Sequence, residues 1–382
     1  MRKRETSRRS RRRFLAGAGA AGALGFPALV RAQGVISMRW QSAWPAKDIF
    51  HEYALDFAKK VGDLTGDELR IEMLPADTVV PATQLLEAVG KGALDGAHGL
   101  LSHHYGKHPA LVLWGSGPAF GMDANMLLAW HKYGGGNALL AKIYDAIGAN
   151  VAAFLYGPMP TQPLGWFKKR ITKPGDLNGL TIGIGGTPAE LFAGLGVKAS
   201  ALTAGDIASA VARGLPDLDA VENNNPTSDR ALGLPRVAKV YMMRSYHQNA
   251  EQFEILLNKA KFDALPSRLR AVIANAVEAA SADMSWKAID RYSQDYVAML
   301  ANEAVVAYAT PDSVLRKQLE AHEAAASTHR SEPLFREIEE SQRQFAARAV
   351  RWYLATQASP RLAYDYYFRR KPVVRRPRRK TK

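Results

Sequence analysis

The stretch from residue 180 to residue 222 most constrains the fold, because short apolar strands alternate in it with short helices. Leu180 to Ile184 is a β-branched run, and Val197 to Leu202 and Leu215 to Glu222 are two further expected strands. Thr187-Pro-Ala-Glu190 has the pattern of a helix-opening capping box, and 205–213 is a second short helix stopped by a glycine. This alternation predicts an α/β fold with a parallel sheet.

The same alternation of strands and helices predicts where a ligand binds. In parallel sheets, ligands lie beyond the carboxyl ends of the strands. Gly185, Gly186 and Glu222 fall at such ends, and the helix at Thr187 points its N-terminal amides to the same place. We therefore expect a small-molecule site here.

The ends of the chain differ from its middle in charge. The net charge is +15, but residues 1–32 hold nine basic residues and 369–382 hold nine more. The remaining 33 basic and 35 acidic residues nearly cancel, which argues against a nucleic-acid-binding face. We interpret 369–382 as a disordered basic tail. The absence of cysteine excludes disulfides, thiolate catalysis and cysteine-bound zinc.

The N-terminus has the pattern of an export signal. Paired arginines at 11–13 precede Phe14 and Leu15, a small apolar stretch follows, and Val30-Arg-Ala32 is a cleavage-type triplet. This resembles a twin-arginine signal peptide over residues 1–32, cleaved near Ala32, and it predicts a periplasmic protein. A glycine pattern at 17–22 resembles a dinucleotide fingerprint, but no strand precedes it, so we reject that interpretation.

Most of the remaining chain repeats the strand–helix pattern. Strands are expected at 36–44, 69–74, 94–98, 151–156 and 253–258, and helices at 51–64, 82–91, 125–133 and 138–146. Residues 110–120 predict a loop or edge strand. Pro266 opens a helical pattern that reaches about residue 304, long enough to brace two lobes, and helices near 312–329 and 333–356 follow.

At this point the sequence resembles a known family. The features that carry the resemblance are Leu94-Asp-Gly96, Leu164-Gly-Trp-Phe-Lys168, Asp176-Leu-Asn-Gly-Leu180, Leu218-Asp-Ala220 and Asn258-Lys259. Their order and spacing over about 36–356 resemble the solute-binding subunits of TRAP transporters, and the closest branch is the one that binds 2-oxo acids. Such proteins are not enzymes. They close two α/β lobes on a solute and deliver it to membrane permease subunits.

The resemblance implies a domain organisation and a homodimer through the C-terminal helices. It divides the chain into a signal peptide at 1–32, a first lobe at 33–159 completed by part of 250–310, a second lobe at 160–249, a bracing helix at 265–304, C-terminal helices at 310–368 and the tail at 369–382.

The resemblance also implies a cation site. Gln162 and Glu222 stand where that branch has metal ligands, the backbone carbonyl of Asn223 takes the third position, and Gln248 stands where the branch has a second acid. All are oxygen donors suited to one sodium or calcium ion, and a single carboxylate favours sodium, or no ion, over calcium. The family's carboxylate-binding Arg is replaced by Gly183.

Because that Arg is missing, we expect a small organic acid held by amides and imidazoles. The expected ligand-binding residues are Trp44, His103, His104, Gln162, Gly183, Gly185, Glu222, Asn223, Asn225 and Gln248. Trp44 is either a wall of the cleft or core. A zinc site at His103, His104 and His108 is disfavoured. His104 and His108 are four residues apart, as on a helix, but Gly106 and Pro109 argue against a helix there.

One alternative function stays open from the residues. Glu222 with a nearby histidine could serve an exported hydrolase or lyase. No nucleophile elbow and no pair of catalytic acids accompanies it.

Overall fold

The computed structural model describes residues 34–159, 162–185, 192, 194–202 and 204–369. The expected signal peptide, the capping box at 187–190 and residues 370–382 of the basic tail lie outside the described residues. From Ser37 onward the chain is one compact unit.

The first sheet is built around a wholly buried apolar strand. Its order is β2 (Leu69–Leu74), β1 (Ile36–Ser42), β3 (Gly96–Leu100), β10 (Phe253–Asn258) and β4 (Val151–Tyr156). β1 and β3 are parallel, whereas β10 runs antiparallel to both of its neighbours. β10 returns to this sheet from the far end of the sequence, so the first lobe is completed by a later segment.

The second sheet is mixed: the three strands of 180–222 are parallel as predicted, and β5 (Gly165–Phe167) runs against its neighbours. The strand order is β11 (Val306–Ala309), β9 (Val240–Met243), β5, β8 (Ala220–Val221), β6 (Thr181–Gly185) and β7 (Lys198–Leu202). β6 is parallel to β7 and β8, but β5 is antiparallel to β8 and β9. The β5 strand enters from the other lobe, so no helical crossover sets its direction.

Helices cover both sheets, and one further difference from the sequence analysis lies next to α7 (Ala204–Ala212). The helices are α2 (Ile49–Thr65), α3 (Leu85–Gly90), α4 (Ala124–Tyr133), α5 (Gly136–Ala146), α7, α8 (Pro226–Leu232), α9 (Leu234–Val237) and α10 (Lys259–Ala264). The expected strand at 215–222 shrinks to β8, because Leu215 has φ +55° and turns back on α7.

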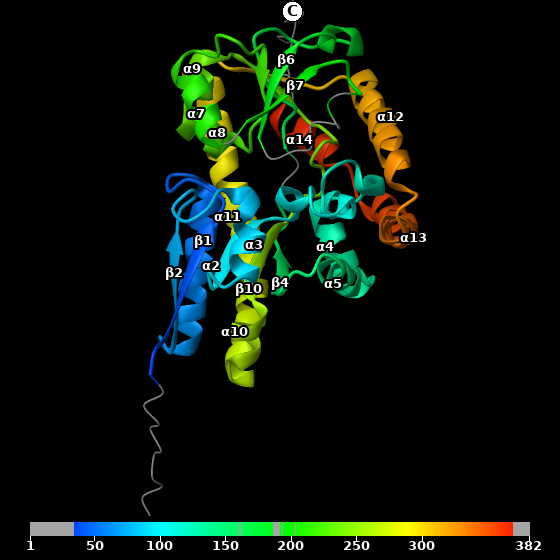
Figure 1. Cartoon of the computed structure of the whole chain (residues 1–382). Helices are drawn as coiled ribbons and strands as arrows, with labels where there is room; N and C mark the ends of the chain where they lie inside the picture. Colours follow the sequence, from blue (N-terminus) through cyan, green and yellow to red (C-terminus); the bar gives the residue numbers. More distant parts are fainter. Residues whose placement is uncertain (1–33, 160–161, 186–191, 193, 203, 370–382) are drawn as a thin grey trace, which may run out of the picture. The chain divides into compact units, whose positions relative to one another are not determined.

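The long helix is α11 (Ser267–Asn302), which spans about 54 Å at 1.5 Å per residue. It contacts α2 beside the first sheet and α8 beside the second (Figure 1). Lys287 pairs with Asp56 of α2, and Asp295 accepts hydrogen bonds from Thr227 and Arg230 of α8. One rigid element thus bonds to both lobes.

Three helices end the described chain: α12 (Asp312–His329), α13 (Pro333–Thr356) and α14 (Pro360–Phe368). α12 packs Val314 and Ala321 onto the second sheet. α13 covers 109–121, where 3₁₀ helices at Pro109–Trp114 and Ala119–Gly121 replace the expected loop or edge strand. No described helix combines the length and the apolar character that a membrane crossing requires.

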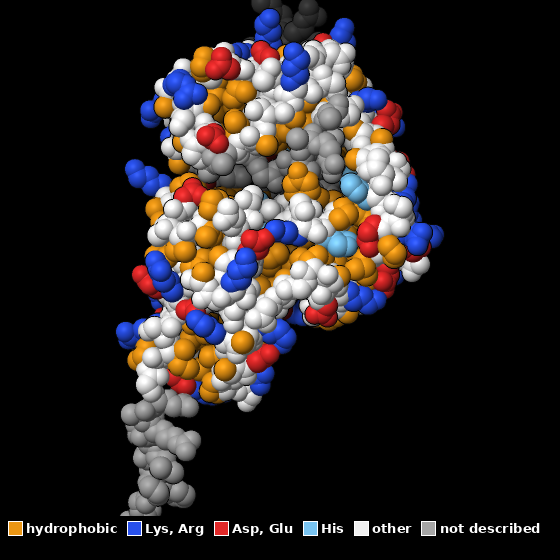
Figure 2. All heavy atoms as spheres, in the orientation of Figure 1, with side chains coloured by type: hydrophobic (Ala, Val, Ile, Leu, Met, Phe, Trp, Pro, Cys, Tyr) orange, Lys and Arg blue, Asp and Glu red, His pale blue; other side chains and the backbone are white. Residues whose placement is uncertain are grey.

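The viewed surface mixes both signs of charge. Figure 2 shows Lys and Arg side chains interspersed with Asp and Glu over this face of the molecule. Over the described residues many such charges pair across short distances, as in Lys132 with Glu278 at 2.5 Å and Lys142 with Glu337 at 2.6 Å. This distribution agrees with the near-zero charge of the chain between its ends.

A buried carboxylate organises the second lobe. Asp229 is fully buried and accepts hydrogen bonds from Trp166 Nε1 at 2.7 Å, Tyr241 Oη at 3.0 Å and Asn223 Nδ2 at 2.7 Å. Trp166 and Tyr241 stack with ring centroids 4.1 Å apart. Burial raises the pKa of Asp229 from 3.8 to about 7, against the opposing effect of the three hydrogen bonds.

This pKa predicts how stability depends on pH. Because the pKa of Asp229 is higher in the folded protein than the value of 3.8 for an unperturbed group, its protonated form favours folding. That stabilisation is complete below about pH 3.8 and is lost as the pH rises to about 7. The unfolding free energy of the wild type relative to Asp229→Asn should therefore fall across this range, by at most about 1.4 kcal/mol per pH unit. Urea unfolding at a series of pH values measures it, and a difference independent of pH would contradict the prediction.

Candidate functional site

Three loops of the second lobe meet at the ends of neighbouring strands. Gln162 precedes β5, Glu222 and Asn223 follow β8, and Gln248 follows β9. The backbone N–H of Glu222 donates to the carbonyl of Gly183 at 2.9 Å, which ties this loop to β6. The structure thus brings together the four residues that the sequence analysis assigned to a cation.

Oxygen atoms converge on the amide of Gln162. One terminal atom of this amide lies 2.8 Å from Glu222 Oε1 and 3.0 Å from the carbonyl oxygen of Asn223, and it also contacts Gln248 Oε1. The side chains are almost wholly buried, with 2% of Gln162, none of Glu222 and 2% of Gln248 exposed. A terminal atom with three oxygen neighbours is the central feature of this site.

The identity of that terminal atom has a chemical consequence. As nitrogen it carries two hydrogens and can serve only two of the three acceptors at once. As oxygen it completes a group of four oxygens, which repel one another unless a cation lies among them. Oxygen donors of this kind bind sodium and calcium. The residues therefore fit a cation that turns the amide oxygen inward, and the amide can turn its nitrogen inward when the cation leaves.

The charge at this site is low. Among the described residues, no group of three or more His, Asp or Glu side chains could hold a metal ion. Glu222 is the carboxylate among the four expected ligands, so amide and carbonyl oxygens supply the rest. This composition favours a hard cation with oxygen ligands over zinc.

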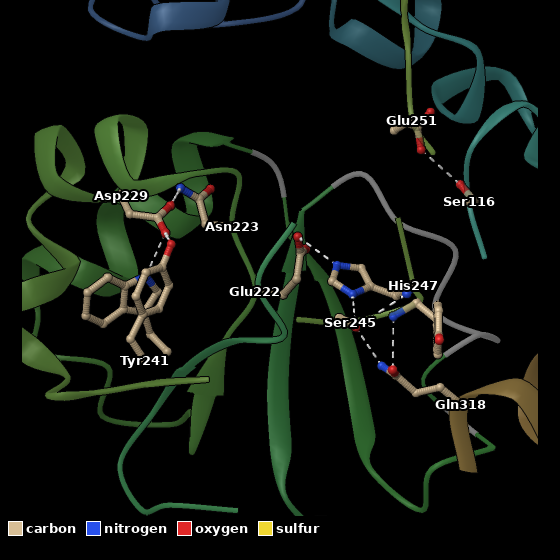
Figure 3. A network of polar contacts seen from close by, with 11 residues as sticks. Ser116, Glu222, Asn223, Asp229, Tyr241, Ser245, His247, Glu251 and Gln318 are labelled. Atoms are coloured by element: carbon tan, nitrogen blue, oxygen red, sulfur yellow. Dashed lines mark hydrogen bonds and ion pairs between the residues drawn. The ribbon is translucent and has the colours of Figure 1, made fainter. Parts of the chain in front are cut away.

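A second buried acid stands beside the site. Glu251 is 1% exposed and accepts a hydrogen bond from Ser116 Oγ at 3.2 Å (Figure 3). Burial raises its pKa from 4.5 to about 8, hydrogen bonds from Ser116 and Gln248 oppose the shift, and the negative charge of Glu222 adds to it. Sequence reasoning missed Glu251, because nothing in its local pattern distinguishes this acid from other polar residues.

A series of polar contacts connects α12 to Glu222. Gln318 Nε2 donates to Ser245 Oγ at 2.7 Å, and Ser245 Oγ lies 2.5 Å from His247 Nδ1. His247 Nε2 lies 3.5 Å from Glu222 Oε1. Figure 3 shows these four side chains pointing toward one another, and the sequence analysis had assigned none of the first three to the site.

The aromatic residues of the first lobe form a separate cluster. Trp44 is buried, with its ring 5.0 Å from that of His98 and 6.0 Å from that of His103. Burial lowers the pKa of His103 to about 3, so this imidazole is neutral at physiological pH. His104 Nε2 lies 3.2 Å from Glu254 Oε2 in the interior, which directs His104 into the fold.

The remaining expected ligand residues have local structural roles. Asn225 caps α8, where its Oδ1 accepts from Thr227 N at 3.0 Å and Ser228 N at 2.9 Å. It also lines a cavity of about 40 Å³ with Met159 and Tyr292. Gly185 ends β6, paired with Leu202.

Gly183 lies in the middle of β6 against apolar side chains. A Cβ at this position would meet Leu202 Cδ1 at 2.8 Å and Leu218 Cδ1 at 3.0 Å. These leucines fill the space that the stem of a longer side chain would need. Two arginines of the same lobe are engaged elsewhere: Arg230 pairs with Asp295 and Glu303, and Arg244 donates to the carbonyl of Thr310 at 3.2 Å.

Comparison with known proteins identifies the family. The sequence pattern described as bacterial extracellular solute-binding protein, family 7, matches residues 41–331. A monocarboxylate 2-oxoacid-binding periplasmic protein of Nostoc sp. PCC 7120 is 32% identical over 253 residues, which are 66% of this chain and 68% of that protein.

Two solved structures are similar to the fold. A TRAP transporter solute-binding protein of Bordetella bronchiseptica, a dimer with calcium and picolinate bound, superposes with a TM-score of 0.79 at 26% identity and covers 87% of this chain and 97% of its own. A TRAP solute-binding protein of Pseudoalteromonas atlantica, with sodium and pyruvate bound, superposes with a TM-score of 0.74 at 22% identity and covers 85% of this chain and 100% of its own.

The family consists of receptors that bind small organic acids, so the alternative of a hydrolase or lyase using Glu222 is not supported. Relatives hold calcium or sodium beside the organic acid, in agreement with the expected single ion. The two mixed sheets, the long α11 and the match over 41–331 together place the protein in bacterial extracellular solute-binding protein family 7, as a periplasmic receptor of the TRAP transporters.

Proposed function

We propose that the protein captures a small monocarboxylate with a second donor atom next to the carboxylate, such as a 2-oxo acid, together with one cation. The supporting observation is the group of oxygens around the Gln162 amide. The proposed ion ligands are Gln162, Glu222, the carbonyl of Asn223 and Gln248. The cation then contributes the positive charge that Gly183 does not.

The ligands of the relatives share one chemical feature. Pyruvate in the Pseudoalteromonas protein carries a carbonyl next to its carboxylate, and picolinate in the Bordetella protein carries a ring nitrogen in the same place. Either molecule can chelate a cation through two atoms. The Nostoc relative is named for monocarboxylate 2-oxo acids. A chelating monocarboxylate is therefore the ligand class that we assign.

Charge balance favours a divalent cation. Glu251 is neutral at pH 7, since burial raises its pKa to about 8. Glu222 and a bound monocarboxylate together carry two negative charges, which calcium balances and sodium only halves. This count includes the ligand's own charge, and it reverses the preference for sodium that Glu222 alone suggests.

The proposal extends to the partners of the protein. The chain would be exported under its N-terminal signal, be cleaved near Ala32 and release its solute to TRAP permease subunits. We also propose a homodimer through the C-terminal helices. Trp352 is 67% and Phe368 74% exposed, and α14 has no buried residue. The Bordetella relative is a dimer.

Removing one ion ligand tests the site. Gln162→Leu deletes both amide atoms, and we expect it to weaken calcium-dependent pyruvate binding at least 100-fold in isothermal titration calorimetry. The wild type at a ligand concentration 100 times the Kd should gain about 2.7 kcal/mol of stability. Gln344→Leu, at an exposed position of α13, is the matched control and should bind as the wild type does. Equal affinities for both variants would refute the ion site.

Changing the charge at Glu222 tests the balance. Glu222→Gln leaves one negative charge with the ligand bound, which sodium alone can match. We expect calcium-dependent affinity to fall at least tenfold and the ratio of calcium-dependent to sodium-dependent affinity to fall with it. Titrations in each salt at pH 7 measure both quantities. A variant that keeps the wild-type preference for calcium would rule out the charge argument.

Polar substitutions on α14 test the dimer. Tyr367→Ser with Phe368→Ser removes two exposed rings, and we expect a monomer where the wild type is a dimer in light scattering after gel filtration. Trp286→Ser, an exposed tryptophan of α11, should leave the mass unchanged. A monomeric wild type, or a dimer that survives the double substitution, would disprove this interface.

A further inference from the structure

The donor and the acceptor can be assigned at each contact between α12 and Glu222. The backbone N–H of Tyr246 donates to Gln318 Oε1 at 3.0 Å, which fixes the orientation of that amide. Gln318 Nε2 must then face Ser245, where it donates to Oγ at 2.7 Å. The orientation therefore follows from a backbone donor whose polarity cannot reverse.

The hydroxyl of Ser245 determines which nitrogen of His247 accepts a hydrogen bond. Ser245 Oγ also receives the backbone N–H of His247, at 3.4 Å, so both of its lone pairs have donors. Its single hydrogen is left for His247 Nδ1, 2.5 Å away. Nδ1 thus accepts, and the hydrogen of the neutral imidazole is on Nε2.

Nε2 of His247 is buried and aimed at one acceptor. His247 is 3% exposed, and its ring packs against Phe192 at 5.2 Å between centroids. Nε2 lies 3.5 Å from Glu222 Oε1 and has no hydrogen-bond partner in the described part of the chain. A buried N–H without a partner carries a free-energy cost, so its placement needs a reason.

The same helix also contacts the loop beside Gln248. His322, one turn after Gln318, packs its ring where a Cβ of Gly117 would stand. Gly117 donates to the carbonyl of His247 at 2.6 Å and bridges to Gln248. The segment 245–248, which supplies the proposed ion ligand Gln248, is therefore held by α12 both directly and through Gly117.

We propose that His247 is a positioning residue for the ion site, because it directs its Nε2–H toward Glu222. Gln318 of α12 acts through Ser245 to keep the ring hydrogen on Nε2. This inference rests on the proposed function, because it requires Glu222 to be an ion ligand. A donor beside a ligating carboxylate can orient it, and losing an outer-shell partner of this kind typically weakens metal binding 10–100-fold.

The first test reads the hydrogen position without any ion. In calcium-free protein labelled with ¹⁵N-histidine, long-range ¹H–¹⁵N correlation should show the Nε2–H form of His247. The signal is assigned by its loss in His247→Gln. Ser245→Ala removes the donor to Nδ1 and should give a mixture of both forms. A wild type with hydrogen on Nδ1, or an unchanged signal in Ser245→Ala, would overturn the proposal.

The second test measures calcium affinity with calcium alone as the probe. His247→Phe keeps a ring against Phe192 but has no donor, and we expect affinity to fall 10–100-fold. His247→Gln restores an N–H near Nε2 and should stay within about threefold of the wild type. His131→Phe, at a buried histidine of α4, is the matched control and should not change affinity.

The outcomes separate this inference from the proposed function. If neither wild type nor any variant binds calcium or sodium, the ion site itself fails. If Gln162→Leu loses binding while His247→Phe keeps wild-type affinity, the ion site stands and the role of His247 is refuted. Should His247→Phe fail to fold, Ser245→Ala decides, because the role predicts a measurable loss of calcium affinity there too.

Discussion

The buried carboxylate of Glu222 is the constraint on which the site depends. A charge without solvent exposure is costly unless opposite charge or hydrogen bonds compensate it. Here the neighbours within reach are the amide of Gln162, the imidazole of His247 and the nearby acid Glu251. A cation at this position would relieve both the burial cost and the repulsion among the converging oxygens. Part of the free energy of binding would then come from the attraction between this buried carboxylate and the ion.

The architecture explains how such a group stays in place. Gln162, Glu222 and Gln248 come from three loops, each fixed by a strand of one sheet, and α11 bonds to the helices of both lobes. Asp229 adds a second buried anchor, because Asn223 donates to it while the backbone of Asn223 faces Gln162. Ligand loops on rigid elements keep their geometry better than free loops, which a site with one carboxylate and otherwise uncharged oxygens needs.

The sequence predicted the parts of this structure that local pattern determines. The periodicity placed α11, α12 and α13 within a few residues of their bounds, and the apolar runs located β4 and β10. Local pattern could not show that β5 runs antiparallel, or that α13 covers 109–121 and folds it into 3₁₀ turns. Gln162, Glu222 and Gln248 lie up to 86 positions apart. Only the resemblance to a family related them, and nothing local distinguished Glu251 or the Gln318–Ser245–His247 chain from ordinary polar residues.

The missing arginine links the fold to the choice of ligand. The Cδ1 atoms of Leu202 and Leu218 lie in the space beside Gly183, so a longer side chain at this position would have to displace both leucines. A receptor with an arginine grips a carboxylate directly and bidentately. In the proposed site the compensating positive charge is a bound cation, so the carboxylate of the ligand would bind through that ion. The ion would bind most tightly a molecule that offers it two donor atoms. Selectivity for the atom next to the carboxylate would then follow from coordination chemistry, with little contribution from the rest of the solute.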